Sequence, residues 1–326
     1  MIKTYYYSIE QQTVLHDVDL SRLDELLASP DSLLWIDLYD CSASELHFVG
    51  DLFQFHPLAL EDCLQQSPRA KLDRYDDYHF FVFHGLRYFE EAEEEDEITS
   101  IELDVFMGSN YIVTIHPVAL TAVGKVARVC LKEGKYMDMG PEHLLYRIVD
   151  NMVDECFPIL ERLGERIDDL EDSIFIKRGQ TVTEEILALK TTITLLRKVM
   201  IPQRRIFGSI NGYYSFLVNE ENRPYYLDLV DHMDNILDTA STYRDLINNS
   251  TETYYSIITG RTSEVITILT IISIVMMPLT VITSFYGMNL ENLPGADNPS
   301  FVWFLTLGMI TLVGGMLAFF RYRRWI

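Results

Sequence analysis

Side chains with oxygen ligands recur along one line of the segment between residues 225 and 285. Counted from Asp231 in alternate steps of four and three, every position up to Ser263 is polar. Positions spaced in this way lie above one another on one face of an α-helix. The carboxylates on this line recur every seven residues and form an acidic ladder: Asp231, Asp238, Asp245 and Glu252. Because hard divalent cations prefer oxygen ligands, the line predicts a surface that attracts them.

The same count continues into an uncharged stretch, where it gives Ile266, Thr270, Ser273, Met277, Thr280 and Ser284. Several copies of the helix around an axis would turn this polar line inward and enclose a wet pore. The hydroxyl groups would then contact water or hydrated ions. The apolar side chains Ile266 and Met277 would form constrictions, which can gate a pore by dewetting.

Directly after this stretch, Asn289 offers an amide carbonyl oxygen. Such an oxygen suits the water shell of Mg²⁺, which gives up its water reluctantly. Gly287 permits a tight backbone turn that would bring several such amides together, and Glu291 and Asp297 could attract cations to the mouth. One alternative stays open for the acidic ladder, which could be the solvated face of an amphipathic helix without any transport role.

One long helix over Tyr225–Phe285 is needed to place these residues in line. A second line of the same helix is almost continuously apolar and predicts a seam that packs on a protein wall. Its members are Leu229, Met233, Ile236, Ala240, Tyr243, Ile247, Ser250, Tyr254 and Ile257.

Two uncharged runs, Val265–Phe285 and Phe301–Phe320, are each long enough to cross a bilayer, which takes about 20 residues. The loop between them holds no Lys or Arg, whereas three Arg follow the second run. Since positive residues stay on the cytoplasmic side, we expect a multi-pass membrane protein with both termini in the cytoplasm. The first ten residues lack the apolar core of a signal peptide.

The part before the long helix mixes strand and helix signals and then becomes purely helical. Strands are predicted at Lys3–Ile9, Leu33–Leu38, Lys71–Tyr75, His79–Phe89, Ile98–Met107 and Tyr111–His116. Helices are predicted at Asp19–Ala28, Ser42–Phe53, Leu58–Leu64, Ala119–Leu131, Glu142–Ile176 and Thr183–Phe207, with capping boxes at Ser42/Glu45 and Thr181/Glu184. The acidic run Glu90–Glu97 predicts a solvated hairpin loop.

The expected organisation therefore has seven parts. They are an α/β domain over residues 1–135, a helical hairpin over 136–224, a stalk helix over 225–264, a first membrane span over 265–285, an external loop over 286–300, a second span over 301–320 and a basic tail over 321–326.

The chain has 326 residues and a formal net charge of −23, which argues against nucleic acid as a partner. Its cysteines, Cys41, Cys63, Cys130 and Cys156, are far apart and predict reduced, buried thiols rather than disulfides or a zinc site. The sequence holds no H-E-x-x-H pair, phosphate-binding loop or nucleophile elbow. We therefore expect neither an enzyme nor an organic cofactor.

The stretch Tyr286-Gly287-Met288-Asn289, placed between two such spans, resembles the signature of CorA-type magnesium transporters. Other stretches are similar to the same family: His56-Pro-Leu-Ala-Leu-Glu61-Asp62, Arg261-Thr-Ser-Glu-Val265, Met277-Pro-Leu-Thr280 and the basic tail with Trp325. The similarity extends over the whole chain.

This resemblance implies a funnel-shaped homopentamer in the inner (plasma) membrane, in contact with lipid, with the α/β domain in the cytoplasm. Gly287, Met288 and Asn289 would form the selectivity filter. Together with Thr270 from the polar line, the residues that would face or narrow the pore are Ser263, Ile266, Leu269, Ser273, Met277, Thr280 and Ser284.

The resemblance also implies that divalent cations are sensed between subunits, at Glu61, Asp62, Asp150 and Asp228. Bound Mg²⁺ would bridge the carboxylates and hold the pore closed, and its loss would let the repelling subunits part. Mg²⁺ would then be both substrate and regulator, with Co²⁺ and Ni²⁺ as further substrates. The alternative for these four residues is that they are surface carboxylates without a sensing role.

Three functions are therefore compared. The first is Mg²⁺ uptake through a gated pore, and the second is transport of zinc or another transition metal, with or without proton coupling. The third is a membrane-anchored metal sensor that conducts nothing. The polar line inside the first span argues against the third.

Overall fold

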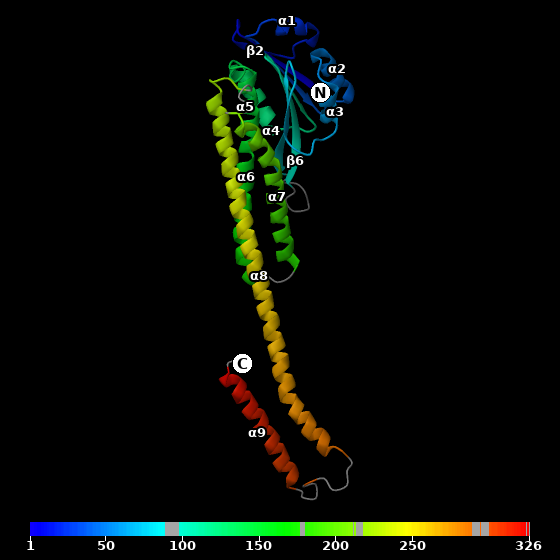
Figure 1. Cartoon of the computed structure of the whole chain (residues 1–326), viewed down its shortest axis with the longest axis vertical. Coiled ribbons are helices and arrows are strands. Elements are labelled where there is room, and N and C mark those ends of the chain that lie inside the picture. The colour runs from blue at the N-terminus through cyan, green and yellow to red at the C-terminus, as the bar shows by residue number, and fades with distance from the viewer. Residues whose placement is uncertain are drawn as a thin grey trace. The chain divides into compact units, whose positions relative to one another are not determined.

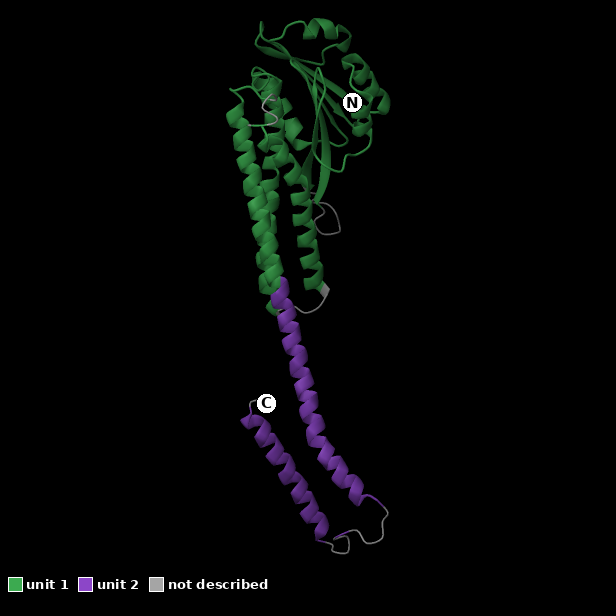
Figure 2. Ribbon diagram, viewed as in Figure 1, with its two compact units in different colours: residues 1–250 green, residues 251–326 purple. Residues whose placement is uncertain are grey.

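The computed structural model describes residues 1–88, 98–176, 180–210, 212, 218–288, 294, 300–323 and 325. These residues form two compact units, Met1–Ser250 and Thr251–Ile326 (Figure 2). The division falls within helix α8, which extends over Arg223–Tyr286. The acidic run predicted at 90–97 lies outside the described residues.

The first unit contains a seven-stranded sheet with the order β2-β1-β3-β7-β6-β5-β4. Its strands are β1 Ile2–Ser8, β2 Thr13–His16, β3 Leu33–Tyr39, β4 Lys71–Arg74, β5 His79–Tyr88, β6 Ile98–Met107 and β7 Tyr111–His116. The β3–β7 pair is parallel and the other neighbours are antiparallel. All six predicted strands are confirmed, with ends that differ by one residue at most. The sequence did not predict β2, an exposed edge strand without apolar alternation.

The helices form a layer on each face of this sheet (Figure 1). Helices α1, α2 and α3 pack on one face, and α4, α5 and α7 contact the other. The helical elements are η1 Leu20–Arg22, α1 Leu23–Leu27, α2 Ala43–Phe53, α3 Pro57–Leu64, α4 Thr121–Glu133, α5 Pro141–Asp154, α6 Cys156–Ile176, α7 Gln180–Gly208, α8 Arg223–Tyr286 and α9 Phe301–Tyr322.

Two helix starts follow directly from side-chain chemistry. Ser42 and Glu45 form the predicted capping box at the start of α2, each side chain bonded to the other residue's backbone N–H. His56 caps α3 by accepting a hydrogen bond from the Leu58 N–H at 3.2 Å, and Pro57 takes the first helical position. These local signals place α3, which carries Glu61 and Asp62.

One helix prediction is wrong, for a physical reason. The helix expected over Glu142–Ile176 is two helices, because α5 ends at Asp154 and α6 begins at Cys156. Pro158 lacks an N–H, and its ring would clash with the carbonyl group of Asp154 in a continuous helix. Helix α7 already includes Gln180, three residues before its expected start, and the capping box at Thr181 and Glu184 stays a prediction.

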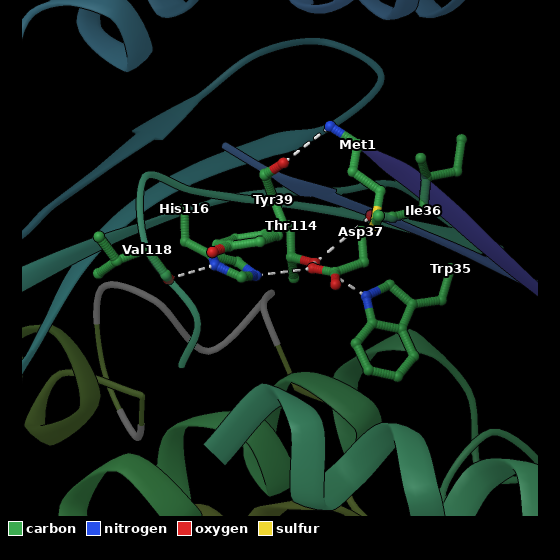
Figure 3. A network of polar contacts seen from close by, with 8 residues as sticks. All are labelled: Met1, Trp35, Ile36, Asp37, Tyr39, Thr114, His116 and Val118. Atoms are coloured by element: carbon green, nitrogen blue, oxygen red, sulfur yellow. Dashed lines mark hydrogen bonds and ion pairs between the residues drawn. The ribbon is translucent and has the colours of Figure 1, made fainter. Parts of the chain in front are cut away.

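A buried polar network joins the two parallel strands β3 and β7 (Figure 3). Trp35 Nε1 donates to Thr114 Oγ1 at 3.0 Å, and Thr114 Oγ1 donates to Asp37 Oδ1 at 2.7 Å. The His116 ring contacts Asp37 Oδ1 at 3.0 Å and the Val118 carbonyl oxygen at 2.7 Å. The ring therefore links the Asp37 carboxylate to the backbone that follows β7. The network therefore adds polar contacts between the central strands, on top of the apolar packing of Ile36 and Val113 in the same core.

The second unit contains the C-terminal part of α8 and helix α9. Both α8 and α9 are long and apolar enough to cross a membrane. The rings of Tyr286 and Phe301 lie 5.4 Å apart, next to the loop between the helices. Phe320 stacks on Trp325 at 5.8 Å near the other end of α9.

Candidate functional site

The predicted seam of α8 packs inside the first unit as far as Ser250, and its last two members, Tyr254 and Ile257, lie in the second unit. Leu229, Met233, Ile236, Ala240 and Ile247 have no exposed surface. The predicted acidic ladder lies on the exposed side of the same helix, with Asp231, Asp238 and Asp245 in the first unit and Glu252 in the second. Because the seam determines how the helix is rotated, it also determines that the ladder points away from the subunit's own core.

The predicted pore-lining residues lie on α8 in the second unit, where most side chains of the helix are exposed in the single chain. They are Ser263, Ile266, Leu269, Thr270, Ser273, Met277, Thr280 and Ser284, and all of them are exposed. In contrast, Ile271 is buried and Ile282 is half-buried on another side of the helix. Near the start of the line, Ser263, Ile266 and Thr270 share a cavity of about 790 Å³ with Trp325.

Three hydroxyl groups of the line, those of Thr270, Ser273 and Thr280, bond to the helix itself. Thr270 Oγ1 donates to the Ile266 carbonyl oxygen at 2.7 Å, and Ser273 Oγ donates to the Leu269 carbonyl oxygen at 2.8 Å. Thr280 does the same one turn back at 2.9 Å. Their hydrogen atoms are therefore engaged, and the oxygen lone pairs are what they offer outward. A row of acceptors suits a hydrated cation, whose water molecules present hydrogen atoms to the surroundings.

The signature residues follow the end of α8. The Gly287 N–H donates to the Thr283 carbonyl oxygen at 2.9 Å, and the Met288 side chain is exposed. A Cβ at Gly287 would lie 3.0 Å from that same carbonyl oxygen, so a larger residue would strain the turn. Asn289, the third residue of the predicted filter, lies outside the described residues, as do Glu291 and Asp297.

A second cluster brings together Asp150 and Asp154 of α5 and His232 of α8. One ligand atom from each side chain lies within 4.8 Å of the others, a spacing that could hold a metal ion. Asp150 Oδ1 and His232 Nδ1 are 3.8 Å apart, and both are buried atoms without a hydrogen-bond partner. Asp228 Oδ2 lies 3.8 Å from the other ring nitrogen of His232. Carboxylate oxygens and an imidazole nitrogen are a ligand set that divalent cations accept.

The electrostatics of this cluster favour a cation. Burial and the neighbouring Asp154 raise the pKa of Asp150, although Arg147 and His232 lower it in part. Burial and Asp150 raise the pKa of Tyr146 to about 12. A divalent ion between the two aspartates would offset their repulsion.

The four predicted sensing residues fall into two groups within one chain. Asp150 and Asp228 flank His232, on the side of the sheet covered by α5. Glu61 and Asp62 lie on α3, on the opposite face (Figure 1). Asp62 is paired with Lys71 Nζ at 2.5 Å, and Glu61 accepts a hydrogen bond from Gln65. One chain therefore does not bring the four carboxylates together.

Asp154 and His232 were not predicted as site residues. Both are marked in the sequence by spacing, because Asp150/Asp154 and Asp228/His232 are each four residues apart and share a helix face. Nothing in the sequence showed that these two faces meet.

Comparison with known proteins assigns the chain to a family. The family model described as CorA-like Mg²⁺ transporter protein matches residues 30–324. The Bacillus subtilis protein YfjQ is 31% identical over 100% of this chain and 98% of its own length. The cobalt/magnesium transport protein CorA of Thermotoga maritima is 28% identical over 100% of this chain and 92% of its own length.

The fold has a counterpart among solved structures. The CorA magnesium transporter of Methanocaldococcus jannaschii superposes with a TM-score of 0.85, at 22% identity, over 100% of this chain and 99% of that one. This match confirms the predicted fold of an α/β unit, a long helix and two apolar helices. The chain therefore belongs to the CorA-like Mg²⁺ transporter family, whose members are membrane transport proteins and not enzymes.

Proposed function

We propose that this chain is the subunit of a homopentameric, channel-type transporter that moves Mg²⁺ into the cell down its electrochemical gradient. It would lie in the inner (plasma) membrane with both termini in the cytoplasm. The observation that carries the proposal is the polar line of α8, which is exposed in both units, while in the first unit the apolar seam beside it is buried. Copies arranged around an axis would turn this line toward one another and enclose water.

Along such a pore, each part of the line has its own role. The acidic ladder Asp231, Asp238, Asp245 and Glu252 would raise the local concentration of cations, since rings of carboxylates do so at a channel entrance. The back-bonded hydroxyls would accept hydrogen bonds from hydrated ions. Ile266, Leu269 and Met277 would narrow the pore, and Gly287, Met288 and Asn289 would select the ion at its outer end.

Intracellular Mg²⁺ would regulate this pore by binding between subunits. The cluster of Asp150, Asp154 and His232, with Asp228 beside His232, offers one half of a ligand set. Glu61 and Asp62 offer acidic groups on another face of the unit. A neighbouring copy could bring the two halves together where one chain does not. A cation bound there would hold the copies close, and its loss would leave carboxylates that repel one another.

Co²⁺ and Ni²⁺ are proposed as further substrates, and the name of the Thermotoga maritima relative includes cobalt. A transition metal such as zinc is the second candidate for the transported ion, with or without proton coupling. His232 favours it, because an imidazole nitrogen suits transition metals better than Mg²⁺. The polar line argues against the third candidate, a sensor that does not conduct.

Metal-resolved flux into proteoliposomes tests the proposal. Purified protein is reconstituted, and entry of Mg²⁺, Co²⁺, Ni²⁺ and Zn²⁺ is recorded with and without a pH gradient. We expect Mg²⁺ entry that does not depend on the pH gradient and that falls when Mg²⁺ is present inside. Zinc entry that requires the gradient would favour the second candidate, and the absence of all flux would favour the sensor.

A further inference from the structure

Part of helix α7 is strongly basic, although the chain as a whole is acidic. The chain carries 26 Lys and Arg against 49 Asp and Glu, yet residues 186–208 of α7 hold five basic side chains and no acidic one. Three of these five, Lys190, Arg197 and Arg204, recur every seven residues, so they share one face of the helix. This basic row belongs to neither site described above, and the proposed transport does not use it.

Arg204, at the end of the basic row, is paired with a carboxylate of α8. Its Nε donates to Asp234 Oδ1 at 2.7 Å, and its Nη2 donates to Asp234 Oδ2 at 2.8 Å. These hydrogen bonds lower the pKa of Asp234. The pair shows that the basic row faces α8, and that at this level of the two helices a cation meets an anion.

The other two members of the row, Lys190 and Arg197, meet no anion. Both are half-buried, and they line a cavity between α7 and α8 together with Arg244 and Asn248 of α8. In the part of the chain that the structure describes, neither Lys190 nor Arg197 forms an ion pair with an Asp or Glu. The cavity therefore gathers three cations within an otherwise acidic protein.

The sequence of α8 explains why the pairing stops. The two helices are antiparallel here, because residues earlier on α7 face residues later on α8. Counted in sevens from Asp234, the matching positions of α8 are Ser241 and Asn248, and both side chains are neutral. An aspartate at either position would have continued the pairing, but α8 adds Arg244 instead.

The side chains that line the cavity are hydrogen-bond donors of the kind that bind oxyanions. Arg197 and Arg244 carry guanidinium groups, whose fork of N–H groups matches the oxygens of a phosphate. Lys190 adds an ammonium group, and neither type of cation can accept a hydrogen bond. Asn248 adds an amide N–H donor from α8. Donors from two helices thus line one space.

Two contacts limit the attraction for an anion but do not cancel it. Arg244 bonds through Nε and Nη2 to Asp245 Oδ1 at 3.1 and 3.0 Å, so its Nη1 is not used in that pair. Asp245 is 63% exposed, and water therefore screens its charge. Thr194 Oγ1 donates to the Lys190 carbonyl oxygen at 2.7 Å, so its hydroxyl group is not a donor to the cavity. Three cations still outnumber one carboxylate.

The size of the cavity fits a small anion. Its volume is about 310 Å³, at the lower end of the range of about 300–1,000 Å³ for small-molecule sites. A phosphate group carries about two negative charges at neutral pH and has several acceptor oxygens, so it can bond to both helices at once. A carboxylate side chain has only two oxygens, fewer than the donors that line this space.

We propose that the cavity between α7 and α8 binds a phosphate-bearing anion, which bridges the two helices. The anion offsets the repulsion among Lys190, Arg197 and Arg244 and takes the place of the carboxylate that α8 lacks there. Inorganic phosphate and the phosphate chain of a nucleotide share the chemistry that this site recognises. The proposal goes beyond transport and holds whichever cation the pore moves.

Isothermal titration calorimetry of the full-length protein in detergent tests the proposal. Inorganic phosphate and adenosine triphosphate are titrated separately, without divalent cations and at constant ionic strength, so that neither chelation nor screening contributes. We expect one anion bound per chain, with a Kd below about 1 mM. Tighter binding of the triphosphate would identify a nucleotide as the source of the phosphate group, and equal or weaker binding would identify inorganic phosphate.

Three variants locate the binding in this cavity. Arg197→Gln should weaken it about tenfold, because a charge-assisted hydrogen bond is lost. Asn248→Asp is nearly isosteric and supplies the missing carboxylate, as Asp234 does for Arg204, so it should also weaken binding about tenfold or more. Arg205→Gln, at an exposed position of the same helix, is the matched control and should keep the wild-type affinity.

An absence of binding to the wild-type protein would overturn the proposal, and so would unchanged affinity in either Arg197→Gln or Asn248→Asp. Since Asn248 is exposed, that variant keeps the test valid if Arg197→Gln does not fold. If a carboxylate of a second copy fills the cavity instead, no anion binds and Arg197→Gln weakens the oligomer in detergent. That result would also reject the proposed site.

Discussion

Helix α8 belongs to two units, and its apolar side chains are mostly buried in the first unit but mostly exposed in the second. In the first unit, Leu229, Met233 and Ile236 have no exposed surface. In the second unit, Val265 and Leu269 are more than half exposed in the single chain. The first unit therefore closes its own hydrophobic core, and the second needs lipid or further copies of the chain to cover its apolar surface.

The polar line shows the complementary difference. In the first unit its charged members are carboxylates, which water solvates at little cost. In the second unit, the hydroxyls of Thr270, Ser273 and Thr280 bond back to the helix, so these three donors are satisfied in an apolar setting. The same helical spacing thus continues from the first unit into the second, while the polar side chains on it change from carboxylates to hydroxyls.

The largest effect is expected where the hydroxyl line ends. Asn289→Ala should abolish selective Mg²⁺ flux and leave assembly intact, because no carbonyl oxygen would remain to order the hydrated ion. Flux of Mg²⁺ compared with Na⁺ in proteoliposomes measures the selectivity, and the oligomeric state in detergent measures the assembly. Normal selectivity in this variant would reject the proposed filter.

The contrast between the units predicts that the same substitution, Ile to Ala, changes the free energy of unfolding by very different amounts at two positions of α8. Ile236→Ala should lower the free energy of unfolding of the first unit by about 2–5 kcal/mol, since it leaves a cavity in a packed core. Ile272→Ala, the matched substitution at a position 54% exposed in the second unit, should leave that free energy within about 0.5 kcal/mol.

Denaturant unfolding followed through the buried Trp35 reports on the first unit. Similar losses of unfolding free energy in Ile236→Ala and Ile272→Ala would show that burial of α8 does not differ between the two units.

The cation cluster predicts a change in regulation. Asp228→Lys should raise the internal Mg²⁺ concentration needed for half-inhibition about tenfold, because an ammonium group beside His232 repels the ion. Flux at graded internal Mg²⁺ checks this, with Glu161→Lys as an exposed control for charge reversal. Unchanged inhibition would remove Asp228 from the proposed sensor.

The smallest effect is expected for the acidic ladder. Asp238→Asn combined with Asp245→Asn should lower conductance about twofold at low salt and less at high salt, since exposed charges are screened within about 10 Å at 0.1 M. Single-channel or flux measurements at two ionic strengths test it. An effect that does not vary with salt would favour the alternative of a solvated amphipathic face.

Local signals predicted most of the fold. The capping box at Ser42 and Glu45 and the strand β6 depend on residues close in sequence, and the structure confirms both. The break between α5 and α6 was missed although Pro158 marks it, because the apolar period continues across the break. The edge strand β2 was missed because its side chains are exposed and leave no pattern.

By itself, the sequence determined the periods of α8: which residues share its apolar seam, which share its polar line, and which stretches are long enough to cross a membrane. Only the tertiary structure decided that Asp150 and Asp154 meet His232, and that Glu102 and His84 both bond to Ser67. The physical reason is that periodicity places residues on a face of one element. Which faces come together depends on how side chains from distant segments pack, and no local pattern carries that information.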